Sequence, residues 1–226
     1  MIEVWLPWVE LSRAQMPGGQ ELLLRERNGS FEIRCDGREL MSTRAHASEE
    51  NMARLACERL AEPSAAHVLV GGLGLGYTLR AALDALPASA AVLVAELMPE
   101  VVDWNRGPLA SVAGRPLEDR RVEIYLGDVR DVLRTAQACF DAILLDVDNG
   151  PDFPTRCGNT WLYAPEGLAL IQRALRRGGV LAVWSAYPST GFETRLHQAG
   201  FIAECIDVPV VDAAVGPMHT IFLARI

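Results

Sequence analysis

Residues 67–80, HVLVGGLGLGYTLR, decide the fold of this chain. Residues 68–70 are apolar and predict a buried strand, while residues 77–86 predict a helix. Glycines at positions 71, 72, 74 and 76 separate the two elements. Glycine lets the backbone approach a ligand closely because it carries no Cβ. A strand, a glycine-rich turn and a helix in this order indicate the nucleotide-type ligand site of an open α/β sheet.

The chain beyond this turn alternates between strand and helix patterns. Strands are predicted at 91–95, 121–126, 141–145 and 180–184, and a long helix at 161–177, ended by Gly178 and Gly179. The last two strands, 201–208 and 218–225, have no helix between them. We therefore expect an α/β fold with a doubly wound, seven-stranded, Rossmann-like sheet whose last strand is antiparallel.

The first 46 residues have β character. A strand broken by Pro7 is predicted at 2–11, and residues 21–27 and 30–35 flank Asn28-Gly29, a strong hairpin signal. A helix is predicted at 48–60, with Ser48 as its N-cap. We expect an antiparallel N-terminal hairpin region, 1–46, and a ligand-binding domain, 47–226. The hairpins either cover one end of the main sheet or form a dimer contact.

The bulk properties narrow the class of protein. The chain has 226 residues, a net charge of −8 and a pI of about 5.1. An acidic chain is a poor partner for nucleic acid. No basic signal-peptide region is visible, and no apolar run reaches the roughly 20 residues that span a bilayer. Five cysteines without CxxC spacing argue against a disulfide framework or a zinc site. We expect a cytoplasmic protein that acts on a small molecule.

Acidic residues follow three successive predicted strands. Glu96 can accept hydrogen bonds from both ribose hydroxyls, and Asp128 can accept one from a purine amino group. Asp146 and Asp148 follow the next strand, at the edge where such sheets bind ligands. Any one of these acids alone could be a helix cap or a solvated turn residue, but together they predict an adenosine site. Tyr77 breaks the GxGxxG dinucleotide pattern, and no GK[ST] P-loop is present.

These motifs resemble the spermidine synthase family, whose fold is that of S-adenosylmethionine-dependent methyltransferases. The resemblance runs from residue 21 to residue 184 and rests on ELLLRERNGSFEIRCDGRELMSTRAHASEE, VLVGGLGLGYTLRAAL, VLVAELMPEVV, RVEIYLGDVRDVL, FDAILLDVDNGP and RALRRGGVLAV. It implies that Glu96 holds the ribose and Asp128 the adenine amine. Asp146 matches the aspartate that deprotonates the attacking amine, and the loop 149–160 would act as a lid. The family also suggests a homodimer formed through the N-terminal hairpins.

The chain departs from the family at three places. The aspartate of the family's GGGDGG turn is expected at Leu75, and the second aspartate of its DSSDP motif at Asn149. In the HASEE segment only Glu50 stays in register with the family's substrate-binding residues. Each change removes a group that would hold a cationic polyamine or the amine of the decarboxylated cofactor.

The Leu75 change favours intact S-adenosylmethionine as the cofactor. An acid beside the cofactor tail would repel its carboxylate by roughly several kcal/mol at an effective dielectric constant near 20. With leucine there, backbone N–H groups of the turn formed by Gly72, Gly74 and Gly76 are free to receive the carboxylate. We therefore expect a methyltransferase that acts on a small molecule.

Two alternatives remain open at this point. The first is an aminopropyltransferase that uses decarboxylated S-adenosylmethionine and has an altered amine pocket. The second is a non-catalytic nucleoside-binding homologue. In either enzyme, Asp146 or Asp148 would be the base, and Glu50, Asn149, Trp161 and Tyr163 are candidates for acceptor binding. For Trp161 and Tyr163, core packing is slightly favoured over acceptor binding, and His219 is expected to be structural.

Overall fold

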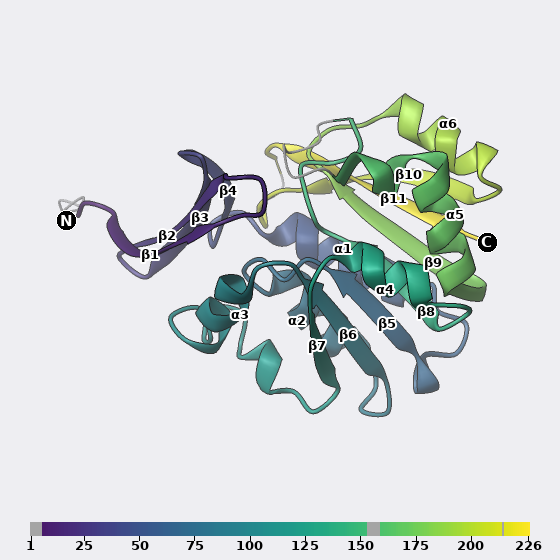
Figure 1. The fold of residues 1–226 in the computed structure, drawn as a ribbon, viewed down its shortest axis with the longest axis horizontal. Helices are drawn as coiled ribbons and strands as arrows, with labels where there is room; N and C mark the ends of the chain where they lie inside the picture. Colours follow the sequence, from purple (N-terminus) through teal and green to yellow (C-terminus); the bar gives the residue numbers. More distant parts are fainter. Residues whose placement is uncertain (1–5, 153–158, 214) are drawn as a thin grey trace.

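The structure is a computed structural model that describes residues 6–152, 159–213 and 215–226. An N-terminal four-stranded sheet projects from an α/β body (Figure 1). Its strands are β1 (Val9–Gln15), β2 (Glu21–Arg27), β3 (Ser30–Cys35) and β4 (Arg38–Ser42), antiparallel throughout. The two predicted hairpin strands therefore form as expected. The first strand lies later than predicted, starting beyond Pro7, and residues 1–5 lie outside the described part.

The α/β body contains a seven-stranded sheet with the order β10-β11-β9-β8-β5-β6-β7. The strands are β5 (His67–Gly71), β6 (Ala91–Glu96), β7 (Val122–Leu126), β8 (Phe140–Leu145), β9 (Leu175–Ser185), β10 (Ile202–Pro209) and β11 (Met218–Arg225). β11 runs antiparallel between β9 and β10, while the pairs from β9 to β7 are parallel. The predicted fold class, with its antiparallel last strand, is confirmed.

Helices cover both faces of this sheet (Figure 1). One face packs against α1 (Ala47–Cys57), α2 (Tyr77–Ala85) and α3 (Pro99–Arg106), and the other against α4 (Val129–Thr135), α5 (Pro165–Ala174) and α6 (Thr190–Gln198). Along β5, Val68 and Val70 join the first core and Leu69 joins the second. This alternation explains why the strand is a continuous apolar run. No helix in the described residues is long and apolar enough to cross a membrane.

Two predicted helices differ from the structure. The helix predicted at 161–177 is divided into a short 3-10 turn, η3 (Asn159–Tyr163), helix α5 and the first residues of β9. Pro165 causes the break, because the residue before a proline avoids the helical region, and Ala164 is extended at φ −81° and ψ 162°. Helix α1 begins one residue earlier than predicted, with His46 as its N-cap residue. Ser48 therefore lies inside the helix and makes other hydrogen bonds.

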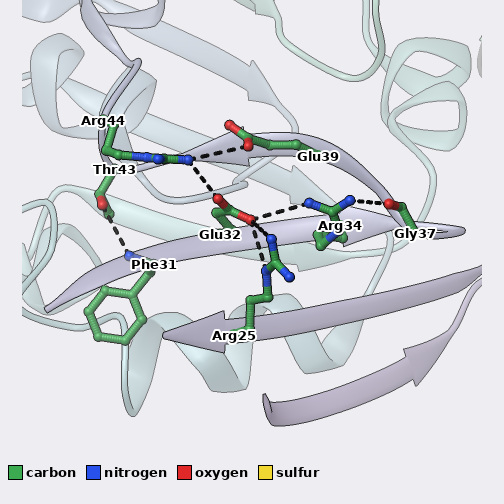
Figure 2. Close-up of polar contacts among 8 residues, drawn as sticks. All are labelled: Arg25, Phe31, Glu32, Arg34, Gly37, Glu39, Thr43 and Arg44. Atoms are coloured by element: carbon green, nitrogen blue, oxygen red, sulfur yellow. Dashed lines mark hydrogen bonds and ion pairs between the residues drawn. The ribbon is translucent and has the colours of Figure 1, made fainter. Parts of the chain in front are cut away.

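The N-terminal sheet is held together on one face by a buried acid. Glu32 is only 2% exposed and forms ion pairs with three arginines, Arg25, Arg34 and Arg44 (Figure 2). Arg44 also contacts the more exposed Glu39. The opposite face carries Leu22, Leu24 and Ile33, which join the core of the α/β body. The sheet is thus anchored by packing on one side and by charge pairing on the other.

Candidate active site

The site lies where the order of successive strands in the sheet reverses. From β5 the chain proceeds to β6 and β7 on one side, and then returns to β8 on the other. Ligands of open α/β sheets bind at such a switch point, beyond the carboxyl ends of the strands. The glycine turn follows β5, and Asp146 follows β8 directly.

Gly72 brings these two segments into contact. Its φ is +88°, and a Cβ placed there would lie 2.2 Å from the carbonyl oxygen of Asp146. The amide of Asp146 also donates to the carbonyl of Gly71 at 2.9 Å. Only glycine suits this position, since both its backbone conformation and the space around it exclude a side chain.

A cavity of about 130 Å³ lies over the glycine turn. Its polar side chains are those of Glu96, Asp128, Asp146 and Asn159, and Gly72 and Gly74 form part of its wall. Apolar residues of the N-terminal region also line the cavity: Met16, Leu22, Ile33, Leu40 and Met41. The N-terminal sheet is therefore part of the site. Below we call this cavity the cofactor-side cavity.

Glu96 lies at the end of β6 and is 7% exposed. Its Oε2 accepts from the amide of Leu73 and its Oε1 from the amide of Met98, both at 2.8 Å. Burial raises the pKa of Glu96, and these backbone hydrogen bonds oppose the rise. Each oxygen keeps a second lone pair, so the carboxylate can still accept hydroxyl groups of a ligand.

Asp128 serves two purposes in the structure. Its Oδ1 accepts from the amide of Arg130 at 2.8 Å and caps helix α4, as the alternative interpretation of this acid allowed. The same side chain lines the cofactor-side cavity and is 36% exposed. Its Oδ2 lies 3.9 Å from Nε of Arg130, so capping leaves this oxygen largely uncommitted.

Asp146 lies at the centre of the site because it lines two cavities. The hydroxyl of Thr78 donates to its Oδ2 at 2.9 Å. Burial raises the pKa of Asp146 to about 6; the Thr78 hydrogen bond opposes this rise and the nearby Asp148 adds to it. The group is therefore ionised near neutral pH and able to take up a proton.

The second cavity, of about 330 Å³, lies on the other side of Asp146. We call it the acceptor-side cavity. It shares Leu40, Met41, Asp146 and Val147 with the first cavity. Its further lining includes Glu39, Glu49, Asp148, Asn149, Trp184 and His219. Two adjoining compartments with one carboxylate between them can hold two reactants side by side.

Glu49 reaches the acceptor-side cavity, whereas the predicted Glu50 does not line either cavity among the described residues. Glu50 instead lies 3.0 Å from Nδ1 of His46. Successive helical residues point about 100° apart, so only one of the two acids can face the site. Burial raises the pKa of Glu49 to about 7, and nearby Asp146 adds to the rise. The two adjacent acids in HASEE are the sequence feature that could have identified Glu49 as a site residue.

Leu75 does not face the cofactor-side cavity. It is 3% exposed and packs in the core beside α2. Gly74 is the position whose side chain would point toward the cavity, since a Cβ there would meet the sulfur of Met41 at 2.7 Å. The prediction that the side chain of residue 75 faces the cofactor tail is therefore wrong, because Leu75 packs in the core.

Asp148 lines the acceptor-side cavity, whereas Trp161 and Tyr163 line neither of the two cavities. Asp148 Oδ1 accepts from the amide of Gly150 at 2.8 Å and from the hydroxyl of Tyr163 at 3.0 Å, and burial raises the pKa of Asp148. Tyr163 is 2% exposed and packs edge-on against Phe192. Trp161 lies beneath the guanidinium of Arg130 at 4.4 Å. Core packing is the observed role of both aromatic rings. The predicted lid, 149–160, includes residues 153–158, which lie outside the described part.

Comparison with known proteins places the chain in a family. Residues 46–194 match the model of the spermine/spermidine synthase domain. The chain belongs to this family. It is 31% identical over 172 residues to a polyamine aminopropyltransferase of Mycobacterium tuberculosis (strain ATCC 25618 / H37Rv), covering 75% of this chain and 31% of the relative. The chain thus spans about a third of the length of that relative.

Solved structures share the fold. Spermidine synthase from Thermotoga maritima superposes with a TM-score of 0.74 at 20% identity, covering 96% of this chain and 72% of that one. A spermidine synthase in complex with the transition state analogue AdoDATO gives a TM-score of 0.73 at 19% identity, with the same coverage of 96% and 72%. Among the described residues, no group of three or more His, Cys, Asp or Glu is placed to hold a metal ion.

Proposed function

We propose that this chain transfers an aminopropyl group from decarboxylated S-adenosylmethionine to a small amine. One observation carries the proposal. Six carboxyl groups line the two adjoining cavities, and the described lining residues include no arginine or lysine. The acids are Glu39, Glu49, Glu96, Asp128, Asp146 and Asp148. Such a lining attracts cations and repels anions.

The charge of the lining favours the decarboxylated cofactor. Decarboxylated S-adenosylmethionine carries a sulfonium and an ammonium group and no carboxylate. The intact cofactor carries the same cations and a carboxylate, which would have no cationic side chain beside it in the described cavities. A carboxylate near Asp146 or Glu49 would be repelled by roughly several kcal/mol at an effective dielectric constant near 20. The acceptor, an amine, is also a cation in water.

The reaction requires a neutral amine nitrogen aligned with the sulfonium. The nitrogen attacks the aminopropyl carbon bonded to sulfur, the C–S bond breaks, and its electron pair stays on sulfur as methylthioadenosine leaves. The new nitrogen centre carries one proton in excess, which Asp146 accepts. Its position between the two cavities and its pKa of about 6 suit this role. Holding both reactants in line contributes the rest of the acceleration.

The comparisons support this proposal over the methyltransferase expected from the sequence. The curated relative is named as a polyamine aminopropyltransferase, and the structural neighbour was solved with a transition state analogue. With Leu75 turned into the core, the main sequence argument for the intact cofactor is lost.

Methyl transfer remains the competing candidate because of the start of α2. Gly76 precedes this helix with φ +87° and no side-chain cap, so its first amides can receive a carboxylate. Gly74 has no side chain that could block such a carboxylate. These features would serve intact S-adenosylmethionine.

Product analysis tests the proposal. The protein is incubated with each cofactor and a set of small amines, and mass spectrometry distinguishes an added aminopropyl group from an added methyl group. We expect aminopropylated product only, from the decarboxylated cofactor. Asp146→Asn should lower the rate by about 100-fold or more while methylthioadenosine still binds. Asp84→Asn, an exposed aspartate of α2, is the matched control and should leave the rate unchanged.

Two results would contradict the proposal. Methylated product from intact S-adenosylmethionine would establish the competing reaction. Binding of methylthioadenosine without any product from either cofactor would favour a non-catalytic nucleoside-binding homologue.

A further inference from the structure

Ser48 lies at the centre of a hydrogen-bond cluster that the reaction above does not use. It is fully buried in α1, and its hydroxyl meets polar groups from three elements. The indole Nε1 of Trp184 in β9 donates to it at 3.0 Å. Nδ1 of His219 in β11 lies at 3.0 Å, and Oε2 of Glu49 lies at 2.5 Å. Trp184 and His219 also pack edge-to-face, with ring centroids 4.5 Å apart.

The number of protons in this cluster restricts its arrangement. A serine hydroxyl offers one hydrogen and two lone pairs, and the Trp184 N–H always occupies one lone pair. One hydrogen and one lone pair remain for Glu49 and His219. If Ser48 donates to an ionised Glu49, then Nδ1 of His219 must carry a hydrogen and donate to Ser48. If Glu49 is protonated and donates to Ser48, then Ser48 donates to a bare Nδ1, and the hydrogen of His219 lies on Nε2.

We propose that Ser48 and His219 form a proton wire for Glu49, so that the ionisation of Glu49 is coupled to the tautomer of His219. When Nε2 takes up a proton from water, the Nδ1 proton passes to Ser48 and the Ser48 proton passes to Glu49. The reverse sequence releases one proton at Nε2. No bond other than N–H and O–H changes, and the imidazole begins and ends neutral.

The surroundings of the cluster suit this exchange. His219 is half-buried at the acceptor-side cavity, and its Nε2 makes no hydrogen bond to any described residue. The charged groups near Glu49 are acids: Asp146, Asp148 and Glu39 line the same cavity, and Glu50 is its neighbour in the helix. Burial raises the pKa of Glu49 to about 7, and burial lowers the pKa of His219. The lowered pKa of His219 favours its neutral form where Glu49 titrates.

During turnover, the wire provides a second route by which protons leave the site. This part of the inference rests on the proposed function. Amines reach the site as ammonium ions and must lose a proton before attack. Glu49 can take that proton in the acceptor-side cavity. After His219 exchanges its ring hydrogen with water, so that Nε2 carries it and Nδ1 is bare, the Glu49 proton passes to Ser48, the Ser48 proton passes to Nδ1, and Nε2 releases its proton to water. Ser48 and His219 act here through Glu49, as positioning and relay residues.

The test is a nuclear magnetic resonance titration of the free protein, which needs no turnover. Long-range ¹H–¹⁵N correlations report which imidazole nitrogen carries the hydrogen, and His219→Gln assigns the signals. In the wild type we expect Nδ1–H above the titration of Glu49 and Nε2–H below it, with the switch near pH 7. Glu49→Gln and Ser48→Ala should each abolish the switch.

Ser42→Ala is the matched control. Ser42 is a buried serine of the same cavity, and its hydroxyl makes no hydrogen bond to His219. This variant should keep the switch. The proposal is overturned if wild-type His219 keeps one tautomer through the titration of Glu49, or if the switch persists in Glu49→Gln. Comparison of the His219 tautomer in the wild type and in Glu49→Gln tests the proposal even if Ser48→Ala does not fold. Absence of aminopropyl transfer would overturn the proposed function and leave this result standing.

Discussion

Gly72 lies against the backbone of Asp146, where a Cβ would lie 2.2 Å from the carbonyl oxygen. We predict that Gly72→Ala destabilises the protein by at least about 2 kcal/mol more than Gly178→Ala. Both glycines have positive φ, +88° and +78°, but a Cβ at Gly178 meets nothing within 4 Å. The control Gly178→Ala therefore has the conformational cost of a side chain at positive φ, about 1–2 kcal/mol, but no steric collision. Urea unfolding of the two variants measures the difference, and equal midpoints would show that the Asp146 carbonyl accommodates a Cβ at Gly72 without cost.

Glu49 makes the stability of the free protein depend on pH. Its folded pKa of about 7 lies above the unfolded value of 4.5, so the folded state binds more protons between these values. The contribution of Glu49 to stability is present below pH 4.5 and is lost as the pH rises through 7. We predict that Glu49→Gln gains stability over the wild type across this window, on the order of 2 kcal/mol by pH 8.

Thermal unfolding of the two proteins from pH 4 to pH 8 measures this gain. Glu62→Gln, at an exposed position with no side-chain cap role, is the control and should follow the wild type at every pH. A constant difference between Glu49→Gln and the wild type would show that Glu49 is not buried in its ionised form.

For single residues, the sequence predicted the acids at the strand ends correctly, but it did not predict which nearby side chains face the site. Glu96, Asp128 and Asp146 were predicted at strand ends, and the structure places all three on one cavity. Glu49 was missed in favour of Glu50, because residue spacing alone does not fix the rotation of a helix that starts at Ala47. Leu75 was predicted to face the ligand, but in an irregular glycine turn no periodicity says which side chain points inward.

Among the elements, the N-terminal sheet depends on Glu32. Glu32→Gln leaves Arg25, Arg34 and Arg44 without their common carboxylate, and we predict a loss of about 1–3 kcal/mol. The loss is limited because the arginines still reach water. Glu39→Gln, at a side chain 41% exposed, should cost less than about 1 kcal/mol. Urea unfolding and hydrogen exchange of the β2 and β3 amides compare the two. Equal protection of these strands in both variants would contradict the role given to Glu32.

Most elements with a strong local pattern were predicted correctly; one helix failed at a local signal that was overlooked, and one helix cap failed because of tertiary contacts. The hairpin at Asn28-Gly29 and the strand before the glycine turn follow from turn chemistry and apolar runs. The helix predicted at 161–177 fails at Pro165, a signal that the apolar periodicity outweighed. The N-cap predicted at Ser48 fails because Trp184 and His219, far along the chain, bind its hydroxyl instead.

In the whole molecule, the site joins parts of the chain that the sequence keeps far apart. β5, β6 and β8 bring the glycine turn, Glu96 and Asp146 to one edge of the sheet. The N-terminal sheet supplies Leu22, Ile33 and Met41 as the apolar wall over them. The sequence predicted the sheet and its order of motifs. It left open whether the N-terminal hairpins cover the sheet or form a dimer contact. Their side chains line the cofactor-side cavity, and the dimer contact stays a prediction.

The carboxylate lining of both cavities makes the choice of cofactor the central claim. Calorimetric titration of the free protein with decarboxylated and intact S-adenosylmethionine tests it most directly. We predict that the decarboxylated form binds at least about tenfold more tightly, a difference of about 1.4 kcal/mol or more in binding free energy. Equal or tighter binding of intact S-adenosylmethionine would contradict the account.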